Sequence, residues 1–192
     1  MARERESKMF IQTENTPNPA TLKFLPGLTV MENGTADFKQ VSDAENSPLA
    51  RVLFTTDGIT GVFLGSDFIT VTKSNEKSWD LLKPLVLGGI MEHFQSGNPA
   101  ISKVSEVIEP NNLAEVDPLV QKIKELIDTR VRPAVAQDGG DIVYHGFEKG
   151  IVYLQMQGAC SGCPSSSMTL KNGIENMLKH YVPEVVEVQA VE

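Results

Sequence analysis

The chain has 192 residues, of which 41% are hydrophobic and 22% charged, and its formal net charge is −8. This composition is typical of a globular protein with one large domain or two small ones. The acidic balance argues against a nucleic-acid partner, which needs a basic surface, and no apolar run reaches the roughly 20 residues that would cross a membrane.

The first eight residues alternate acidic and basic side chains and contain no apolar segment. Secretory signals need such a segment, and transit peptides are poor in acidic residues. This start therefore predicts a cytoplasmic, bacterial protein. The alternative is a mitochondrial matrix protein whose presequence has been removed.

A first domain is predicted over residues 9–97. Strands are expected at 10–13 and 21–25, a short helix from Ser47-Pro48 to Leu53, and a hairpin formed by 59–64 and 68–73. Between the first two strands, Thr16-Pro17-Asn18-Pro19 predicts a rigid turn, with a docking surface for partner proteins as the alternative. A helix is expected over 78–95, and its predicted apolar stripe consists of Leu81, Leu82, Leu85, Val86, Ile90 and Phe94.

Residues 98–116 predict a linker, because they contain two prolines and an asparagine pair. A second domain is then predicted over 117–192. Its first helix begins at Asp117-Pro118 and should kink or end at Pro133. Strands at 141–144 and 151–155, a helix over 164–180 and a strand near 185–188 complete the order α-β-β-α-β. The expected fold class is α+β, with two helices on one face of a small sheet in this domain.

Cys160 and Cys163 are the only cysteines, and both lie in the segment Gly158-Ala159-Cys160-Ser161-Gly162-Cys163-Pro164. Two thiols at this spacing can bind one metal centre or form a disulfide. The predicted helix that follows Cys163 directs its free N–H groups toward the sulfurs, which favours the metal-binding thiolate form. We therefore predict that both cysteines are ligands in a loop, with ordinary buried cysteines as the structural alternative.

Several kinds of thiol site are compatible with such a pair. A thioredoxin-like fold needs a long remainder, but only 29 residues (192 minus 163) follow Cys163. A zinc site needs more ligands, and His180 would lie about 25 Å away along a helix. An iron–sulfur cluster needs four thiolates, which two chains related by a two-fold axis would provide. Such a cluster would lie at an interface, where exchange is easy, so cluster delivery is the first hypothesis. A dithiol redox protein or thiol sensor is the alternative.

Other polar residues predict no additional site. The histidines, His93, His145 and His180, stand apart in the sequence, so surface or packing roles are expected for them. Asp138 and Asp141 flank a glycine pair and predict a turn that ends a helix. No nucleophile and base are paired, so we do not predict an enzyme.

The motifs of both domains resemble those of the NifU-like (Nfu) proteins. In the second domain these are Arg132-Pro133, Asp138-Gly139-Gly140-Asp141, the cysteine segment through Ser166, and Thr169-Leu170-Lys171-Asn172-Gly173-Ile174-Glu175. In the first they are Met9-Phe10-Ile11-Gln12-Thr13-Glu14, Thr16-Pro17-Asn18-Pro19, Leu22-Lys23-Phe24-Leu25-Pro26-Gly27 and Asp67-Phe68-Ile69-Thr70-Val71-Thr72-Lys73.

This resemblance implies an iron–sulfur cluster carrier. It would bind a [4Fe–4S] cluster between two protomers through Cys160 and Cys163. It would receive the cluster from an upstream donor and pass it to apo-proteins such as lipoyl synthase or respiratory dehydrogenases. The chain lacks the cysteine-rich scaffold and ferredoxin domains of full NifU, so it is not expected to make clusters alone.

Overall fold

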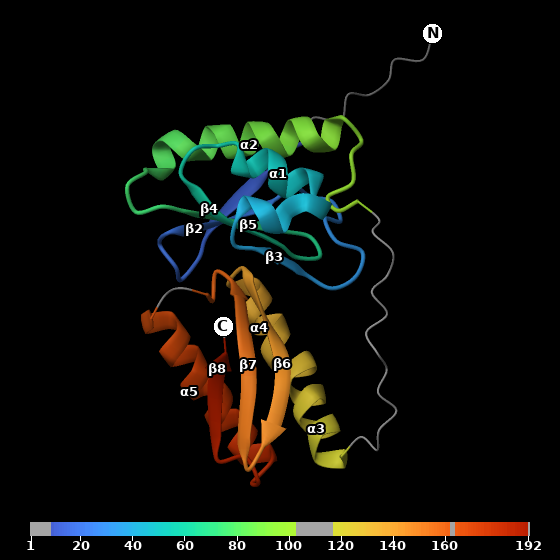
Figure 1. Ribbon diagram of the computed structural model, residues 1–192, viewed down its shortest axis with the longest axis vertical. Coiled ribbons are helices and arrows are strands. Elements are labelled where there is room, and N and C mark those ends of the chain that lie inside the picture. The colour runs from blue at the N-terminus through green and yellow to red at the C-terminus, as the bar shows by residue number, and fades with distance from the viewer. Residues whose placement is uncertain (1–8, 103–116, 162–163, 192) are drawn as a thin grey trace.

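The protein folds into two mixed α/β domains. The computed structural model describes residues 9–102, 117–161 and 164–191. One hydrophobic core lies within residues 11–100 and a separate one within residues 123–188. Figure 1 shows the domains end to end, with the sheet of the first domain facing one end of the second. The predicted α+β class with two domains is confirmed.

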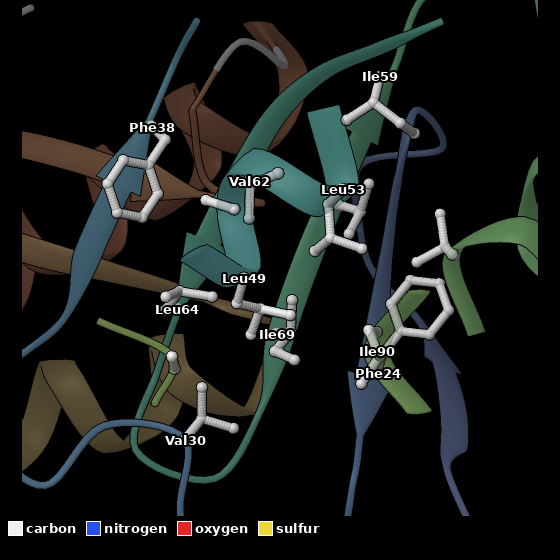
Figure 2. Close-up of a cluster of buried hydrophobic side chains, with 14 of the residues drawn as sticks. Phe24, Val30, Phe38, Leu49, Leu53, Ile59, Val62, Leu64, Ile69 and Ile90 are labelled. Atoms are coloured by element: carbon white, nitrogen blue, oxygen red, sulfur yellow. The ribbon is translucent and has the colours of Figure 1, made fainter. Parts of the chain in front are cut away.

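The first domain is a five-stranded antiparallel sheet in the order β1-β2-β5-β4-β3. Helices α1 and α2 lie on one face of this sheet (Figure 1). Alternate strand residues such as Phe24, Val62 and Ile69 point into the core beneath these helices (Figure 2). The elements are β1 (Gln12–Asn15), β2 (Thr21–Leu25), β3 (Ala36–Phe38), the 3-10 helix η1 (Val41–Asn46), α1 (Pro48–Phe54), β4 (Ile59–Leu64), β5 (Ile69–Lys73) and α2 (Trp79–Gln95).

Most of the elements predicted for this domain are confirmed, including the hairpin of β4 and β5. The first strand begins two residues later than expected, because Gln12 is the first residue to pair with β2. The apolar stripe of α2 was only partly right. Leu82, Val86 and Ile90 are buried, whereas Leu81 and Leu85 are 69% and 58% exposed. The predicted apolar stripe covers more of the helix surface than is buried, since only one side of the helix contacts the sheet.

Trp79 opens α2 and ties it to the sheet. Its indole ring lies edge-on to Phe24, with the centroids 6.4 Å apart. The indole Nε1–H donates to the carbonyl oxygen of Pro19 at 3.3 Å. Trp79 is half-buried against the hydrophobic cluster of the first domain.

The first part of the predicted linker packs on the first domain. Ala100 is buried in its core, and the Ser102 N–H donates to Asn46 O at 2.9 Å. His93 is also buried, with Nε2 3.1 Å from the carbonyl oxygen of Pro99. The rest of the predicted linker, 103–116, lies outside the described residues.

Ser47 connects this segment to α1. It is fully buried, caps α1 by accepting from Ala50 N–H at 3.0 Å, and donates to Ala100 O at 2.7 Å. We expect Ser47→Ala to lower the free energy of unfolding by about 1–2 kcal/mol, because it removes the cap and leaves a buried carbonyl unpaired. Ser78→Ala is the matched control, since Ser78 caps α2 at an exposed position. Urea unfolding of both variants tests this, and equal losses would contradict it.

The second domain is a three-stranded sheet in the order β6-β7-β8, with β6 and β7 antiparallel and β7 and β8 parallel. Alternate residues of β7, Val152, Leu154 and Met156, share a core with Ile127 and Leu178 of the helices. Both helical segments therefore cover the same face, as predicted. The elements are α3 (Pro118–Leu126), the π-helix η2 (Ile127–Val131), α4 (Arg132–Gln137), β6 (Gly140–Glu148), β7 (Ile151–Gly158), α5 (Pro164–Tyr181) and β8 (Glu187–Val191).

Pro133 does not end its helix, but the α-helical pattern is interrupted directly before it. The five residues before α4 form a π-helical turn, and Arg132 N–H donates to Ile127 O, five residues back. The wider turn moves the preceding carbonyls away from the proline ring, and a first-turn position needs no N–H donor. The described part of the chain contains no helix long and apolar enough to cross a membrane.

Candidate functional site

The cysteine segment leaves β7 at the end of the second domain that faces the first (Figure 1). Two glycines with left-handed backbone shape this end, Gly139 at φ +85° and Gly158 at φ +63°. The loop starts with a tight turn, in which Ser161 N–H donates to Gly158 O at 3.1 Å. Ala159 N–H donates to Gly139 O, also at 3.1 Å, and so holds the loop against the start of β6.

Cys160 is buried, not exposed in the loop as expected. Only 6% of the residue is accessible, and it packs with the apolar core of the second domain. Cys163 lies outside the described residues, so the arrangement of the pair stays a prediction. The position of Cys160 thus matches the alternative considered above, an ordinary buried cysteine.

The electrostatic environment of Cys160 also differs from the expectation. Burial raises the pKa of its thiol to about 12, and the nearby carboxylates of Asp138 and Asp141 add to this. The predicted stabilisation of a thiolate by the following helix does not prevail in this arrangement. Because the metal-binding form is the thiolate, Cys160 must lose a proton and gain access to a ligand before it can bind metal.

Gly140 sets the space available to Cys160. A Cβ atom added at this position would lie 2.5 Å from Gln157 O and 2.7 Å from Cys160 Sγ. We expect Gly140→Ala to lower the free energy of unfolding by about 1–3 kcal/mol, because the strand and the thiol cannot both keep their places. Gly146→Ala, in the same strand with nothing within 4 Å of its added Cβ, is the control. Thermal unfolding checks this, and a neutral Gly140→Ala would contradict it.

A buried ion pair lies beside the loop. Asp141 accepts from Arg132 through both oxygens, at 2.8 Å from Nε and 2.7 Å from Nη2, and from its neighbour Ile142 N–H. Burial disfavours the charged carboxylate, but these bonds and one from Thr35 outweigh it and lower the pKa of Asp141. The turn predicted for Asp138 and Asp141 is present. In addition, Asp141 forms the ion pair with Arg132.

The first domain contributes directly to the surroundings of the loop. Asn18 Nδ2 donates to Ser161 O at 3.3 Å, and Thr70 Oγ1 donates to Gly139 O at 3.1 Å. Lys23 Nζ donates to Ala136 O and Gln137 O at 3.2 and 3.0 Å, at the C-terminus of α4. Sequence reasoning missed these residues as part of the site. One available signal was strand alternation, which places Lys23 and Thr70 on the face opposite the core.

The histidines have packing or surface roles, as predicted. His93 is in the core of the first domain, His145 contacts Gln155 Oε1, and His180 stacks edge-on against Tyr181. Among the residues described, no three His, Cys, Asp or Glu side chains are grouped so as to hold a metal ion. The chain on its own therefore offers no complete metal site in the part that the structure covers.

These features define a two-domain α/β protein with a cysteine loop at the domain boundary. Comparison with known families gives the same division. The NifU-like domain matches residues 123–189, and the scaffold protein Nfu/NifU N-terminal domain matches residues 11–97.

Curated relatives match along nearly the whole chain. "NifU-like protein 4, mitochondrial" of Arabidopsis thaliana is 55% identical over 94% of this chain and 65% of its own length. "NFU1 iron-sulfur cluster scaffold homolog, mitochondrial" of Homo sapiens is 54% identical over 95% of this chain and 72% of its own. The chain belongs to the NifU-like (Nfu) family.

The first curated relatives are longer, and the chain spans about 65% of their length. Among solved structures, the solution NMR structure of a NifU-like protein from Saccharomyces cerevisiae covers 54% of this chain and 95% of its own. It does so at 26% identity and a TM-score of 0.47.

Proposed function

We propose that this protein is an iron–sulfur cluster carrier that uses Cys160 and Cys163 as ligands. The observation that carries the proposal is the pair of thiols at Cys-x-x-Cys spacing, in a chain 54% identical to a protein named as an iron–sulfur cluster scaffold. Two thiolates from each of two protomers complete the usual four ligands. Four thiolates can hold either a [2Fe–2S] or a [4Fe–4S] cluster, and the resemblance to the Nfu proteins favours a [4Fe–4S] unit shared by a homodimer. The cluster is cargo, not a catalytic group.

The partners follow from this role. An upstream donor supplies the cluster, and apo-proteins such as lipoyl synthase or respiratory dehydrogenases receive it. We assign the domains to residues 9–97 and 117–192, joined by 98–116. The cytoplasmic location expected from the first residues finds no support among the relatives, which are named as mitochondrial. We therefore place the protein in the mitochondrial matrix, the alternative considered above.

A dithiol redox function is the competing proposal. Reactive thiols have a lowered pKa and are accessible, whereas Cys160 is buried and its pKa is raised. A metal ligand must also be an accessible thiolate, so burial and a raised pKa do not separate the two functions. The carrier is favoured by the 54% identity to a protein named as an iron–sulfur cluster scaffold.

Anaerobic reconstitution with iron and sulfide, followed by native mass spectrometry, tests the proposal. We expect a species heavier than two chains by one Fe₄S₄ unit. A monomer without iron and with a reducible Cys160–Cys163 disulfide would overturn the carrier function and favour the redox one. A dimer with one Fe₂S₂ unit would keep the function but change the cluster type.

A further inference from the structure

The outer face of the first domain's sheet, opposite the helices, has an unusual character. Strand alternation puts Leu22, Phe24, Ile69 and Val71 in the core, and the residues between them on this outer face. A sheet face turned to water is normally polar and exposed. Here it is polar but buried: Thr21, Lys23 and Thr70 are each less than 8% exposed. Something must therefore cover this face.

The cover is the cysteine-loop end of the second domain, residues 136–141 and 158–161. Figure 1 shows β7 and the start of β6 against the sheet of the first domain. Phe63, on the outer side of β4, is 1% exposed, and its ring lies beneath Gly158. Strand β7 contacts both β4 and β5 of the first domain. The contact thus covers the middle of the sheet and is not confined to its edge.

The polar groups of the two domains are matched across this contact. Lys23 is nearly buried, and its ammonium donates to two carbonyls that end α4, where a cation complements the helix dipole. Thr35 Oγ1 donates to Asp141 Oδ2 at 2.8 Å, and Gly158 N–H donates to the Asp37 carboxylate. No buried side-chain nitrogen or oxygen in the described residues lacks a partner. Buried polar groups in native proteins are hydrogen-bonded, and those at this contact are hydrogen-bonded as well.

We propose that the outer face of the first domain's sheet is a docking site for the cysteine loop of its own chain. The residues on both sides of Cys160 are held there: Ser161 by Asn18, Gly158 by Asp37 and Gly139 by Thr70. The first domain is therefore a receptor for the segment around Cys160.

Docking has a consequence that rests on the proposed carrier function. Bonds between metals and thiolates are only about 2.3 Å long, so a second protomer that shares the cluster must bring its own loop close to Cys160. The first domain already occupies the space beside Gly158 and Ser161. The docked state and the cluster-bridged dimer therefore exclude each other, and the two domains must separate before a cluster is shared.

The double variant Lys23→Ala/Thr35→Val tests docking in the full chain without any cluster. It removes three hydrogen bonds to the second domain, two from Lys23 and one from Thr35, and the Lys23–Glu14 ion pair, but no apolar core residue of the first domain. Lys73→Ala is the matched control, because Lys73 lies on the same sheet and its Nζ donates to Ser74 O within the same domain. We expect small-angle scattering to show a compact wild-type monomer, an unchanged control and a larger radius of gyration for the double variant. The loss of three hydrogen bonds that involve a charged group should raise the open fraction about tenfold or more.

Hydrogen exchange gives an independent reading. Amides of residues 137–141 and 158–161 should exchange faster in the double variant than in the wild-type apo-protein. If scattering shows that the wild-type apo chain is extended, docking is overturned. If the apo-protein is a dimer in which the loop of one chain lies on the sheet of the other, docking within one chain is overturned.

The same proteins are then reconstituted anaerobically with iron and sulfide, and cluster uptake is followed by absorbance. We expect the double variant to load severalfold faster than wild type and the control to match wild type. Equal rates, with the double variant shown to be open, would overturn the exclusion. If none of the proteins takes up a cluster, the carrier function fails and the exclusion with it, whereas docking is decided by scattering and exchange alone.

Discussion

Serine in place of either Cys160 or Cys163 is expected to abolish cluster binding. Each change removes one of two thiolates per chain, and a dimer left with two of four ligands cannot hold a four-iron cluster. The structure adds a difference between the variants. Cys160→Ser should also lower the free energy of unfolding by about 1–2 kcal/mol, because it puts a hydroxyl in an apolar core.

Iron content per dimer after reconstitution, together with urea unfolding of the apo-proteins, measures both effects. Ser161→Ala is the control between the two cysteines, since it keeps both thiols and its backbone carbonyl still accepts from Asn18. Retention of a full cluster by either serine variant would contradict the ligand assignment. A Cys160→Ser variant as stable as wild type would contradict the burial argument.

Replacing Asp141 by asparagine is expected to destabilise the second domain by about 2–3 kcal/mol. The carboxylate is 5% exposed and binds the Arg132 guanidinium through both oxygens. Breaking a fully buried pair costs roughly 3–5 kcal/mol, and the value here is lower because the Arg132 side chain is 38% exposed. Asp128→Asn is the matched control, because Asp128 pairs with the same arginine at an exposed position. Urea unfolding followed by circular dichroism measures both losses.

The pH dependence of this difference is a second test of the pair. Arg132, Thr35 and the Ile142 N–H lower the folded-state pKa of Asp141 in spite of its burial. The unfolded chain then binds the proton more tightly, with a pKa of about 3.9. The stabilisation is complete above that pH and is lost as the pH falls through the lower folded-state value. The gap between wild type and Asp141→Asn should therefore shrink in acid, and a constant gap would contradict this origin.

The elements were predictable where hydrophobic periodicity and end signals agree. Asp117 caps α3 as expected, and the segments 59–64 and 68–73, rich in β-branched and aromatic residues, form the expected hairpin. The errors arose where tertiary packing decides. Leu81 and Leu85 have the right spacing for burial but face solvent, and the π-helical turn before Pro133 has no recognised signal in the sequence.

The site was predictable in its chemistry and not in its surroundings. The spacing of Cys160 and Cys163 identified a thiol site, but their spacing alone cannot tell whether a thiol points into a core or toward a ligand. Lys23 and Thr70 lie more than 100 and 60 residues from the backbone atoms they contact. Such long-range partners depend on how the domains meet, which local patterns do not encode.

Trp79 packs α2 against the sheet of the first domain, and its position there separates the absorption and fluorescence signals of the two domains. It is the single tryptophan, whereas the three tyrosines, Tyr144, Tyr153 and Tyr181, all belong to the second domain. Selective excitation of the indole therefore follows the melting of the first domain, and tyrosine absorbance follows that of the second. The intact, unlabelled chain can report whether its halves come apart together or one after the other.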